Sequence, residues 1–464
     1  MRIHKSTGIS FFKKLRSNRK ASFMFIPKSL PYPRLIFLIL LELFQSSKSD
    51  SMLITFVIRD LQKRKVLGKD PIKYSYFELG SSVYHDVYIT ASNGDTFFRG
   101  TSVNLFEAYA KAFGEFFERI FLQYNLDQET IICSQKDMQY NKQAFVSYLD
   151  FPQPTQKQKK FFHDAIITET DMFSWTQATL LSEGIQKWIP SQCIFFRNKE
   201  TFKNEKTIIQ QSTHGAAGGY TQIDAIRSGI HEIIHRHFFL AFWYLKKSPF
   251  KIKLESIPHD SIPMNSIKNF EQQGFTVSLL DFSAEASIPT IICILERCGG
   301  YSCGGSTAST MDECIQRALT EAFSTYLWTQ KITVSGTNRL TQEAIDSIKD
   351  GFIDTVMGDD AHRILAYANS AYTTEMLRYM LSGEESEYTA KYDKKSSYDI
   401  VAHAQELFGG VYAYTYKDPL LTEYEYSVVR IVIPGSYFFA LNEIHSRPIL
   451  YGVEPVYTGI HPFP

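Results

Sequence analysis

The sequence predicts an α+β fold in which mixed sheets are packed by helices. Short strand-like segments separated by turn residues run through the chain, for example residues 74–89, 173–181 and 290–295. Three amphipathic helices interrupt them, and each begins beside a loop of small residues. The polar faces of these helices resemble one another, so we expect them to carry the functional residues.

Composition restricts the class of ligand. The chain has 464 residues, 44% of them hydrophobic, which suffices for a large buried core. Lys plus Arg and Asp plus Glu balance at 49 each, so no overall field attracts nucleic acid or an anionic membrane, and an anionic ligand needs a local site. The six cysteines lack CxxC spacing, which indicates a reducing, cytoplasmic setting and no cysteine-based zinc site.

Residues 1–51 are expected to be an N-terminal extension that need not belong to the fold, and residues 52–464 to form the main domain. Basic residues precede an apolar run at 35–41, which is too short for a bilayer span of about 20 residues. The run imitates a signal peptide, but prolines interrupt it and no small-x-small cleavage site follows. A start at Met52 would also leave a sensible protein.

The first helix is predicted to begin near Leu105, because Asn104 and Glu107 have capping-box spacing after a hairpin with its turn at residues 91–95. At about 100° per residue, one stripe is apolar and is expected to face the core; it holds Phe106, Tyr109, Ala110, Phe113, Phe117 and Ile120. The opposite stripe holds Lys111, Glu115, Glu118 and Arg119. For this helix taken alone, the charges favour a solvated face, with Lys111 paired to Glu115 and Glu115 to Arg119.

The second helix follows a small-residue loop at 212–220, where a ligand could approach backbone N–H groups. Thr221 and Asp224 have capping-box spacing. The apolar stripe is formed by Ile226, Ile230, Ile233 and Ile234, and the polar stripe by Glu232, His235 and Arg236. The pattern Glu-x-x-Glu-Arg at 115–119 thus becomes Glu-x-x-His-Arg at 232–236.

The third helix is predicted after a strand pair, residues 276–281 and 290–295, and a second flexible loop, residues 299–305. Thr310 and Glu313 have capping-box spacing. Its core stripe holds Ile315, Leu319, Ala322 and Tyr326, and its polar side Arg317, Glu321 and Ser324. Further along, residues 338–380 are expected to be helical, 428–433 to be a buried strand, and the Pro-Phe-Pro end at 462–464 to lie extended.

Each of the three helices offers one inward carboxylate one turn from an arginine: Glu115 with Arg119, Glu232 with Arg236, and Glu321 with Arg317. Carboxylates that hold Mg²⁺ and arginines that hold phosphate oxygens suit a polyphosphate bound with its metal. The sequence has no GxxxxGK[ST] and no kinase motif set, so this would be an ATP site of another kind. The structural alternative is that buried Glu/Arg pairs merely pin helices together.

Residues 231–235 read H-E-x-x-H, which is a rival signal for a zinc metallopeptidase. His231 and His235 would bind Zn²⁺ and Glu232 would act as general base. The motif is short enough to arise by chance, and no Gly-x-x-His follows it. The three-helix pattern also explains Glu232, as the counterpart of Glu115 and Glu321, without a zinc site.

Four pieces in this order resemble the YcaO proteins, in particular the cyclodehydratase subunits of azole-forming peptide pathways such as that of microcin B17. They are residues 100–119 with their E-x-x-E-R ending, 212–236, 304–322 and the Pro-Phe-Pro terminus. The resemblance spans most of residues 95–464. It implies a YcaO-like fold around an internal ATP site, with residues 52–464 as the catalytic domain and its extended tail.

The resemblance implies an ATP- and Mg²⁺-dependent enzyme that acts on backbone amides. A Cys, Ser or Thr side chain of a precursor peptide attacks the preceding carbonyl, the amide oxygen is phosphorylated, and phosphate leaves to give a thiazoline or oxazoline. The carboxylate of Pro464 is implied to align or deprotonate the substrate. The implied metal positions are Glu115, Glu118, Glu232, His235 and Glu321, and the implied cofactor-binding residues are Ser102, Arg119, His214, Arg236, Arg317 and Glu321.

Some residues depart from the family pattern. His235 stands where the family usually has a second glutamate, and since Mg²⁺ prefers oxygen ligands, one metal site is expected to be weaker or absent. His214 replaces an asparagine, Arg99 a lysine and Ser324 a glutamine, which affects the details of nucleotide binding.

The resemblance also implies partners. No peptide-clasp or E1-like domain precedes the YcaO region, so a separate protein is expected to bind the leader peptide, beside a flavin dehydrogenase, in a homodimer or larger complex. Two alternatives stay open within the family: thioamide or amidine formation through the same activated amide, and a non-catalytic binding subunit.

Overall fold

A computed structural model of the protein describes residues 3–7, 58–64, 67–91, 97–122, 130–161, 166–196, 202, 204–210, 212–335, 367, 377–395, 397–440, 446–456 and 461–462. The chain forms two compact units. The first comprises Met1–Phe121, Ala217–Ala225 and Thr415–Val429. The second comprises Leu122–Ala216, Ile226–Tyr414 and Arg430–Pro464.

The first unit contains a four-stranded antiparallel sheet in the order β1-β2-β3-β4. Its strands are β1 (Ile3–Thr7), β2 (Leu67–Leu79), β3 (Ser82–Ala91) and β4 (Phe97–Ser102). The predicted β structure at residues 74–89 is therefore confirmed. Residues 3–7 of the predicted extension pair with β2, where Ile3 stands opposite Phe77, whereas residues 8–51 lie outside the described residues.

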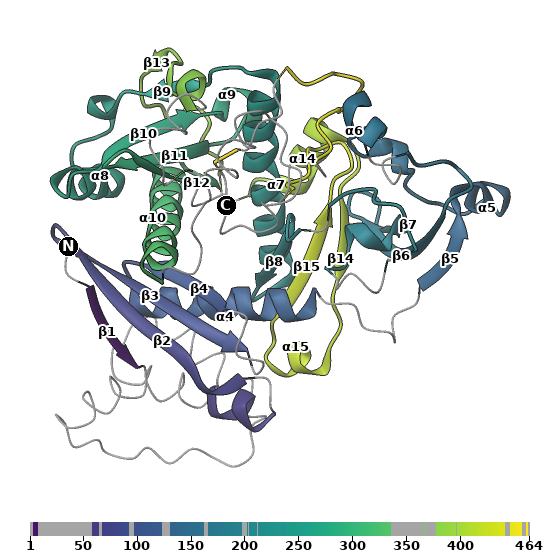
Figure 1. Ribbon diagram of the computed structural model, residues 1–464, viewed down its shortest axis with the longest axis horizontal. Coiled ribbons are helices and arrows are strands. Elements are labelled where there is room, and N and C mark those ends of the chain that lie inside the picture. Colours follow the sequence, from purple (N-terminus) through teal and green to yellow (C-terminus); the bar gives the residue numbers. More distant parts are fainter. Residues whose placement is uncertain are drawn as a thin grey trace. The chain divides into compact units, whose positions relative to one another are not determined.

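Helix α4 (Leu105–Phe121) packs against β3 and β4 (Figure 1) and begins at the predicted residue. The side-chain oxygen of Asn104 accepts hydrogen bonds from the N–H groups of Phe106 and Glu107, which fixes the helix start. The predicted apolar stripe was partly wrong, because the buried residues are Ala108, Tyr109, Ala112, Phe116 and Phe117. The side of the helix that carries Ala108 and Ala112 lies against β4. Gly100 of β4 contacts the helix backbone there, and a Cβ at this position would stand 1.9 Å from the oxygen of Ala108.

The second unit contains a five-stranded sheet in the order β12-β11-β10-β9-β13, in which only β13 runs parallel to its neighbour. Its strands are β9 (Phe250–Ile252), β10 (Thr276–Asp281), β11 (Thr290–Arg297), β12 (Gly300–Thr307) and β13 (Glu385–Ser386). The strand pair at 276–281 and 290–295 is confirmed. The loop predicted at 299–305 was wrong: β12 pairs with β11 along its whole length, and its Gly304 packs against the backbone of a helix.

A six-stranded sheet has the order β5-β6-β14-β15-β8, with β7 paired to β6. Its strands are β5 (Thr130–Ser134), β6 (Met172–Leu180), β7 (Ile185–Pro190), β8 (Ala216–Gly219), β14 (Tyr412–Thr415) and β15 (Ser427–Val432). The predicted buried strand at 428–433 is confirmed as β15, whose residues from Val428 onward are buried. Part of the predicted small-residue loop forms β8.

The helices supply the layers over these sheets, and α10 packs along β11 and β12 (Figure 1). Beside α4 they are α5 (Gln135–Tyr140), α6 (Gln156–Phe161), α7 (Gln222–Leu245), α8 (Ile262–Gln272), α9 (Ser283–Ala286), α10 (Met311–Ser335), α14 (Ile400–Phe408) and α15 (Pro419–Glu423). Thr221 caps α7 and Thr310 caps α10, as predicted. The helical segment expected at 338–380 falls almost entirely outside the described residues. The predicted combination of mixed sheets and helices is confirmed.

Among the helices that the structure describes, none has the length and apolar character required to cross a membrane.

Candidate functional site

Glu115, Glu232 and Glu321 are each held by a hydrogen bond from the main chain. The Oε2 atom of each accepts a hydrogen bond from a backbone N–H that precedes its helix: from Arg99 at 2.7 Å, from Gly215 at 3.0 Å and from Gly305 at 3.0 Å. The donor and acceptor are 16, 17 and 16 residues apart. The predicted equivalence of the three glutamates is therefore a structural one, and each carboxylate has one oxygen fixed by the main chain.

Glycines make this close approach possible. A Cβ at Gly304 of β12 would stand 2.1 Å from the nitrogen of Ala322 in α10, just as one at Gly100 would meet α4. Gly215 has a φ of +77°, and a Cβ there would stand 2.3 Å from the oxygen of Ile431. The small residues were predicted to leave room for a ligand. At these three glycines, the structure fills that room with backbone and so sets where the glutamates sit.

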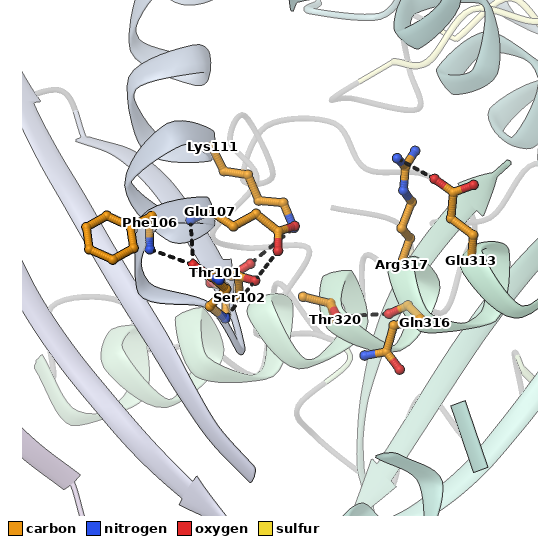
Figure 2. Close-up of polar contacts among 10 residues, drawn as sticks. Thr101, Ser102, Phe106, Glu107, Lys111, Glu313, Gln316, Arg317 and Thr320 are labelled. Carbon is orange, nitrogen blue, oxygen red and sulfur yellow. Dashed lines mark hydrogen bonds and ion pairs between the residues drawn. The ribbon is translucent and has the colours of Figure 1, made fainter. Parts of the chain in front are cut away.

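The arginine partners follow the prediction on two helices of three. Arg119 lies 3.4 Å from Glu115 and Arg236 lies 2.8 Å from Glu232. On the third helix Arg317, which lies one turn from Glu321, instead forms an exposed ion pair with Glu313 at 2.6 Å (Figure 2).

Helix geometry explains this choice. A glutamate four residues before a basic residue is the favourable orientation, and Glu321 follows Arg317 instead of preceding it. For the same reason Lys111 pairs with Glu107 at 2.8 Å (Figure 2) and not with Glu115, as the solvated-face alternative had assumed.

Ser102 is the last residue of β4, just before α4, and Glu118 lies in the last turn of that helix. The Ser102 hydroxyl donates to Glu107 at 2.7 Å and accepts from the N–H of Asn104, so it takes part in fixing the helix start (Figure 2). The Glu118 side chain is 18% exposed, and its Oε1 lies 3.7 Å from Nε of Arg119. Arg119 therefore partly neutralises both Glu115 and Glu118, which reduces the repulsion between these two carboxylates one turn apart.

Three histidines of the second helix and its preceding loop, His214, His231 and His235, are buried. Burial, with Arg236 and Arg430, lowers the pKa of His214 well below its usual value. Burial lowers the pKa of His235 to about 3, with Arg236 contributing, and burial with Arg317 and Arg227 lowers the pKa of His231 to about 3. At the position equivalent to Glu118, the second helix thus supplies no negative charge.

The side-chain types suit a metal–polyphosphate ligand, although in the described part of the chain no group of three or more His, Cys, Asp and Glu could hold a metal ion. The glutamates supply oxygen ligands, and Mg²⁺ needs few of them because phosphates and water complete its shell. Nε of Arg236 is buried and has no hydrogen-bond partner among the described residues, so a donor is left for an anionic oxygen. Both ring nitrogens of His214 are likewise buried and without a hydrogen-bond partner in the described structure. His235 is the exception, since it offers nitrogen and not oxygen.

Zinc is less well accommodated. A catalytic zinc takes three protein ligands, and no group of three or more His, Cys, Asp and Glu in the described part of the chain could hold a metal ion. Both oxygens of Glu232, the general base of that hypothesis, are bonded to Gly215 and Arg236. The metallopeptidase hypothesis therefore gains no support.

The C-terminal tail packs beside Arg236. His461 is buried, with its ring 4.6 Å from that of Phe439, and the Arg236 guanidinium lies 4.7 Å over the same Phe439 ring. No motif marked Phe439 in the sequence. Pro464, the implied substrate-aligning residue, lies outside the described residues.

The sequence analysis also missed Arg430. Its side chain is 2% exposed and donates to the carbonyls of Cys193 and Ser212 at 3.0 and 2.9 Å. It anchors the loop that carries His214 and Gly215. An arginine inside the apolar run Val428 to Ile433 was the available signal, because a buried charge always needs such partners.

Residues 99–436 match the family described as YcaO cyclodehydratase, ATP- and Mg²⁺-binding. No curated protein matches the chain. Among solved structures, a heterocyclase in complex with substrate and cofactor is 16% identical with a TM-score of 0.60; the match covers 82% of this chain and 52% of that one, so this chain spans about half its length.

Two further structures match over most of both chains. The Escherichia coli microcin synthetase McbBCD complex with pro-MccB17 bound is 15% identical with a TM-score of 0.61, covering 86% of this chain and 98% of that one. YcaO from Methanopyrus kandleri, bound with AMPPCP and Mg²⁺, is 12% identical with a TM-score of 0.55, covering 88% and 96%. These structures share the fold, and the family match covers most of the sequence. The chain belongs to the YcaO cyclodehydratases, enzymes that bind ATP and Mg²⁺.

Proposed function

We propose that this chain is the subunit that activates backbone amides of a ribosomally made precursor peptide and closes thiazoline or oxazoline rings. The observation that carries the proposal is the device repeated at Glu115, Glu232 and Glu321, where a main-chain N–H fixes one carboxylate oxygen. Three carboxylates that each have one oxygen bonded to the main chain, in a family that binds ATP and Mg²⁺, are suited to hold metal against phosphate.

The proposed roles follow from the chemistry of each side chain. Glu115, Glu118, Glu232 and Glu321 hold Mg²⁺, with His235 at a weakened position. Arg119, Arg236 and Arg317 bind phosphate oxygens, while Ser102 and His214 contact the nucleotide. Arg317 is available because its exposed pair with Glu313 is worth at most about 1 kcal/mol. When bound, ATP supplies the phosphoryl group that makes an amide oxygen a good leaving group, and Mg²⁺ offsets the negative charge of the phosphates.

The overall reaction balances as loss of one water per ring. The Cys, Ser or Thr side chain bonds to the preceding carbonyl carbon and gives up its proton. The former amide oxygen departs with phosphate, and the nitrogen loses its proton as the C=N bond forms. Pro464 is the proposed acceptor of one of these protons, because its carboxylate ends a tail whose described part is packed beside Phe439.

Residues 52–464 form the proposed catalytic domain, acting in the cytoplasm. The proposed assembly contains a separate leader-binding protein of the E1-like or clasp type and a flavin dehydrogenase, with this chain in a homodimer or larger complex. The microcin synthetase with pro-MccB17 bound, which shares this fold, supports a complex of that kind.

Binding of AMPPCP to the pure protein, measured by calorimetry at increasing Mg²⁺, tests the nucleotide site. We expect Mg²⁺-dependent binding that Glu115→Ala abolishes and Glu313→Gln leaves intact. If no Mg²⁺ concentration gives binding and Glu115→Ala behaves as wild type, the proposal fails. Mass spectrometry of a treated precursor peptide then identifies the product: loss of water supports azoline formation, and exchange of oxygen for sulfur supports thioamidation instead.

A further inference from the structure

Tyr426, which immediately precedes β15 in the first unit, places its hydroxyl between two glycines. A Cβ at Gly218 of β8 would stand 2.3 Å from the hydroxyl oxygen, and a Cβ at Gly114 of α4 would stand 3.0 Å from it. Both distances are shorter than ordinary van der Waals contact. The hydroxyl therefore occupies a slot that exists only because both positions are glycine.

The ring of Tyr426 faces the side of α4 that carries Glu118. Its centroid lies 5.5 Å from that of Phe117. Gly114, Phe117 and Glu118 share one side of the helix, because residues three and four apart are neighbours on a helix surface. Glu118 is thus the acidic side chain one turn from Gly114 on the side of α4 that the hydroxyl contacts.

Two further observations agree with this placement. The charge of Glu118 acts on the Tyr426 phenol, and an ordinary phenol, with a pKa of about 10, is protonated at neutral pH and can donate a hydrogen bond. Tyr220 packs edge-on against the other side of the ring at 5.9 Å, which holds the ring in place.

We propose that Tyr426 is a positioning residue for Glu118: its hydroxyl donates to the Glu118 carboxylate, directly or through one water, and restricts the orientations in which that carboxylate binds Mg²⁺. The inference rests on the proposed role of Glu118 as a metal ligand. It assigns a purpose to Gly114 and Gly218, since a methyl group at either position would push the hydroxyl away.

The test is AMPPCP binding to the full chain at a series of Mg²⁺ concentrations. Tyr426→Phe is expected to raise the Mg²⁺ concentration for half-maximal binding about tenfold, as loss of a hydrogen bond to a charged group should. Binding at saturating Mg²⁺ is expected to stay intact. In a Glu118→Gln background the same change is expected to have less than about a twofold effect, because the charged partner is already gone. Tyr220→Phe, which keeps its ring contact, is the matched control.

The outcomes separate this inference from the proposed function. An unchanged Mg²⁺ requirement in Tyr426→Phe, with a raised one in Glu118→Gln, overturns the inference and leaves the proposed function standing. Failure of the wild type to bind AMPPCP defeats both. A lower melting temperature without a change in Mg²⁺ requirement would indicate a merely structural tyrosine and would also overturn it.

Gly114→Ala provides a second route if Tyr426→Phe does not fold. It displaces the hydroxyl by a few tenths of an ångström without removing it, so a smaller rise in Mg²⁺ requirement is expected. A rise of the same size in a Glu118→Gln background would overturn the inference.

Discussion

The N–H of Gly215 donates to Oε2 of Glu232 over 3.0 Å, although the two residues are 17 apart in the chain. The other oxygen of Glu232 pairs with Arg236 at 2.8 Å. One carboxylate therefore ties a loop to a helix and orients an arginine whose Nε remains available to a ligand. The structural role of Glu232 can be separated from its proposed metal-binding role by a substitution that removes its charge and keeps an oxygen to accept from Gly215.

Glu232→Gln keeps an amide oxygen that accepts from Gly215 but loses the ion pair with Arg236, so it should be destabilised less than Glu232→Ala. Glu232→Ala leaves that N–H unpaired and should lower the free energy of unfolding by about 1–3 kcal/mol. Both variants should lose Mg²⁺-dependent AMPPCP binding, since neither retains the charge. Urea unfolding and calorimetry measure the two effects. Full AMPPCP binding by the glutamine variant would contradict a metal role for Glu232.

Gly100→Ala and Gly304→Ala should both be strongly destabilising, because the new methyl groups would overlap helix backbone at 1.9 and 2.1 Å. Overpacking of this kind costs about 3 kcal/mol or more. Gly274→Ala is the matched control: its φ of +78° is unfavourable for alanine, but no atom lies within 4 Å, so about 1 kcal/mol is expected. Equal melting temperatures for all three variants would show that the strand–helix contact is not required.

The three helices could be predicted because their signals are local. Capping residues such as Thr221 and Thr310, followed by apolar residues at helical spacing, need no knowledge of the rest of the chain. Strand β12 could not be predicted from the sequence, because its Gly, Ser and Cys residues have little preference for strands. Its extended conformation is imposed by pairing with β11 and by contact with α10.

Sequence spacing was also insufficient to predict the contacts of the candidate site. Arg317 lies four residues from both Glu313 and Glu321, so spacing alone allowed either pair, and the preferred order of charges along a helix decided between them. The N–H donors of Arg99, Gly215 and Gly305 depend on how each strand runs against its helix. No residue pattern marks a backbone donor, so the shared device appears only in three dimensions.

Arg236→Ala and Arg317→Ala should differ in stability while both weaken AMPPCP binding. Arg236 is 13% exposed, pairs with Glu232 and stacks on Phe439, so its loss should cost more than about 1 kcal/mol. The Arg317 side chain is 57% exposed, and its pair with Glu313 is of the kind worth at most about 1 kcal/mol. Melting curves with and without AMPPCP separate the effects. Wild-type binding by Arg317→Ala would remove it from the proposed site.

Stability should fall as the pH drops from 7.5 to 5. His231 has a folded-state pKa of about 3, well below its ordinary value near 6.5, so the unfolded chain binds a proton that the folded chain refuses. The lowered pKa costs no stability well above pH 6.5; as the pH falls through 6.5 the unfolded chain takes up the proton, and about 2 kcal/mol is lost by pH 5. Urea unfolding of His231→Phe should show that much less acid sensitivity than wild type. Identical pH dependence in the two proteins would mean that folding does not lower the pKa of His231.

Glu118→Gln and His235→Glu should move the Mg²⁺ requirement in opposite directions. Glu118 supplies an oxygen ligand and a charge, and its counterpart His235 is a neutral imidazole whose pKa is lowered to about 3 by burial and Arg236. Removing the charge at 118 should raise the Mg²⁺ concentration needed for ATPase activity. A glutamate at 235 should be tolerated or lower that concentration, because it adds the oxygen that Mg²⁺ prefers beside Arg236. His235→Gln is the matched control, since it adds an oxygen without charge. If Mg²⁺ titrations of Glu118→Gln and His235→Glu coincide, the two positions are not equivalent parts of one metal site.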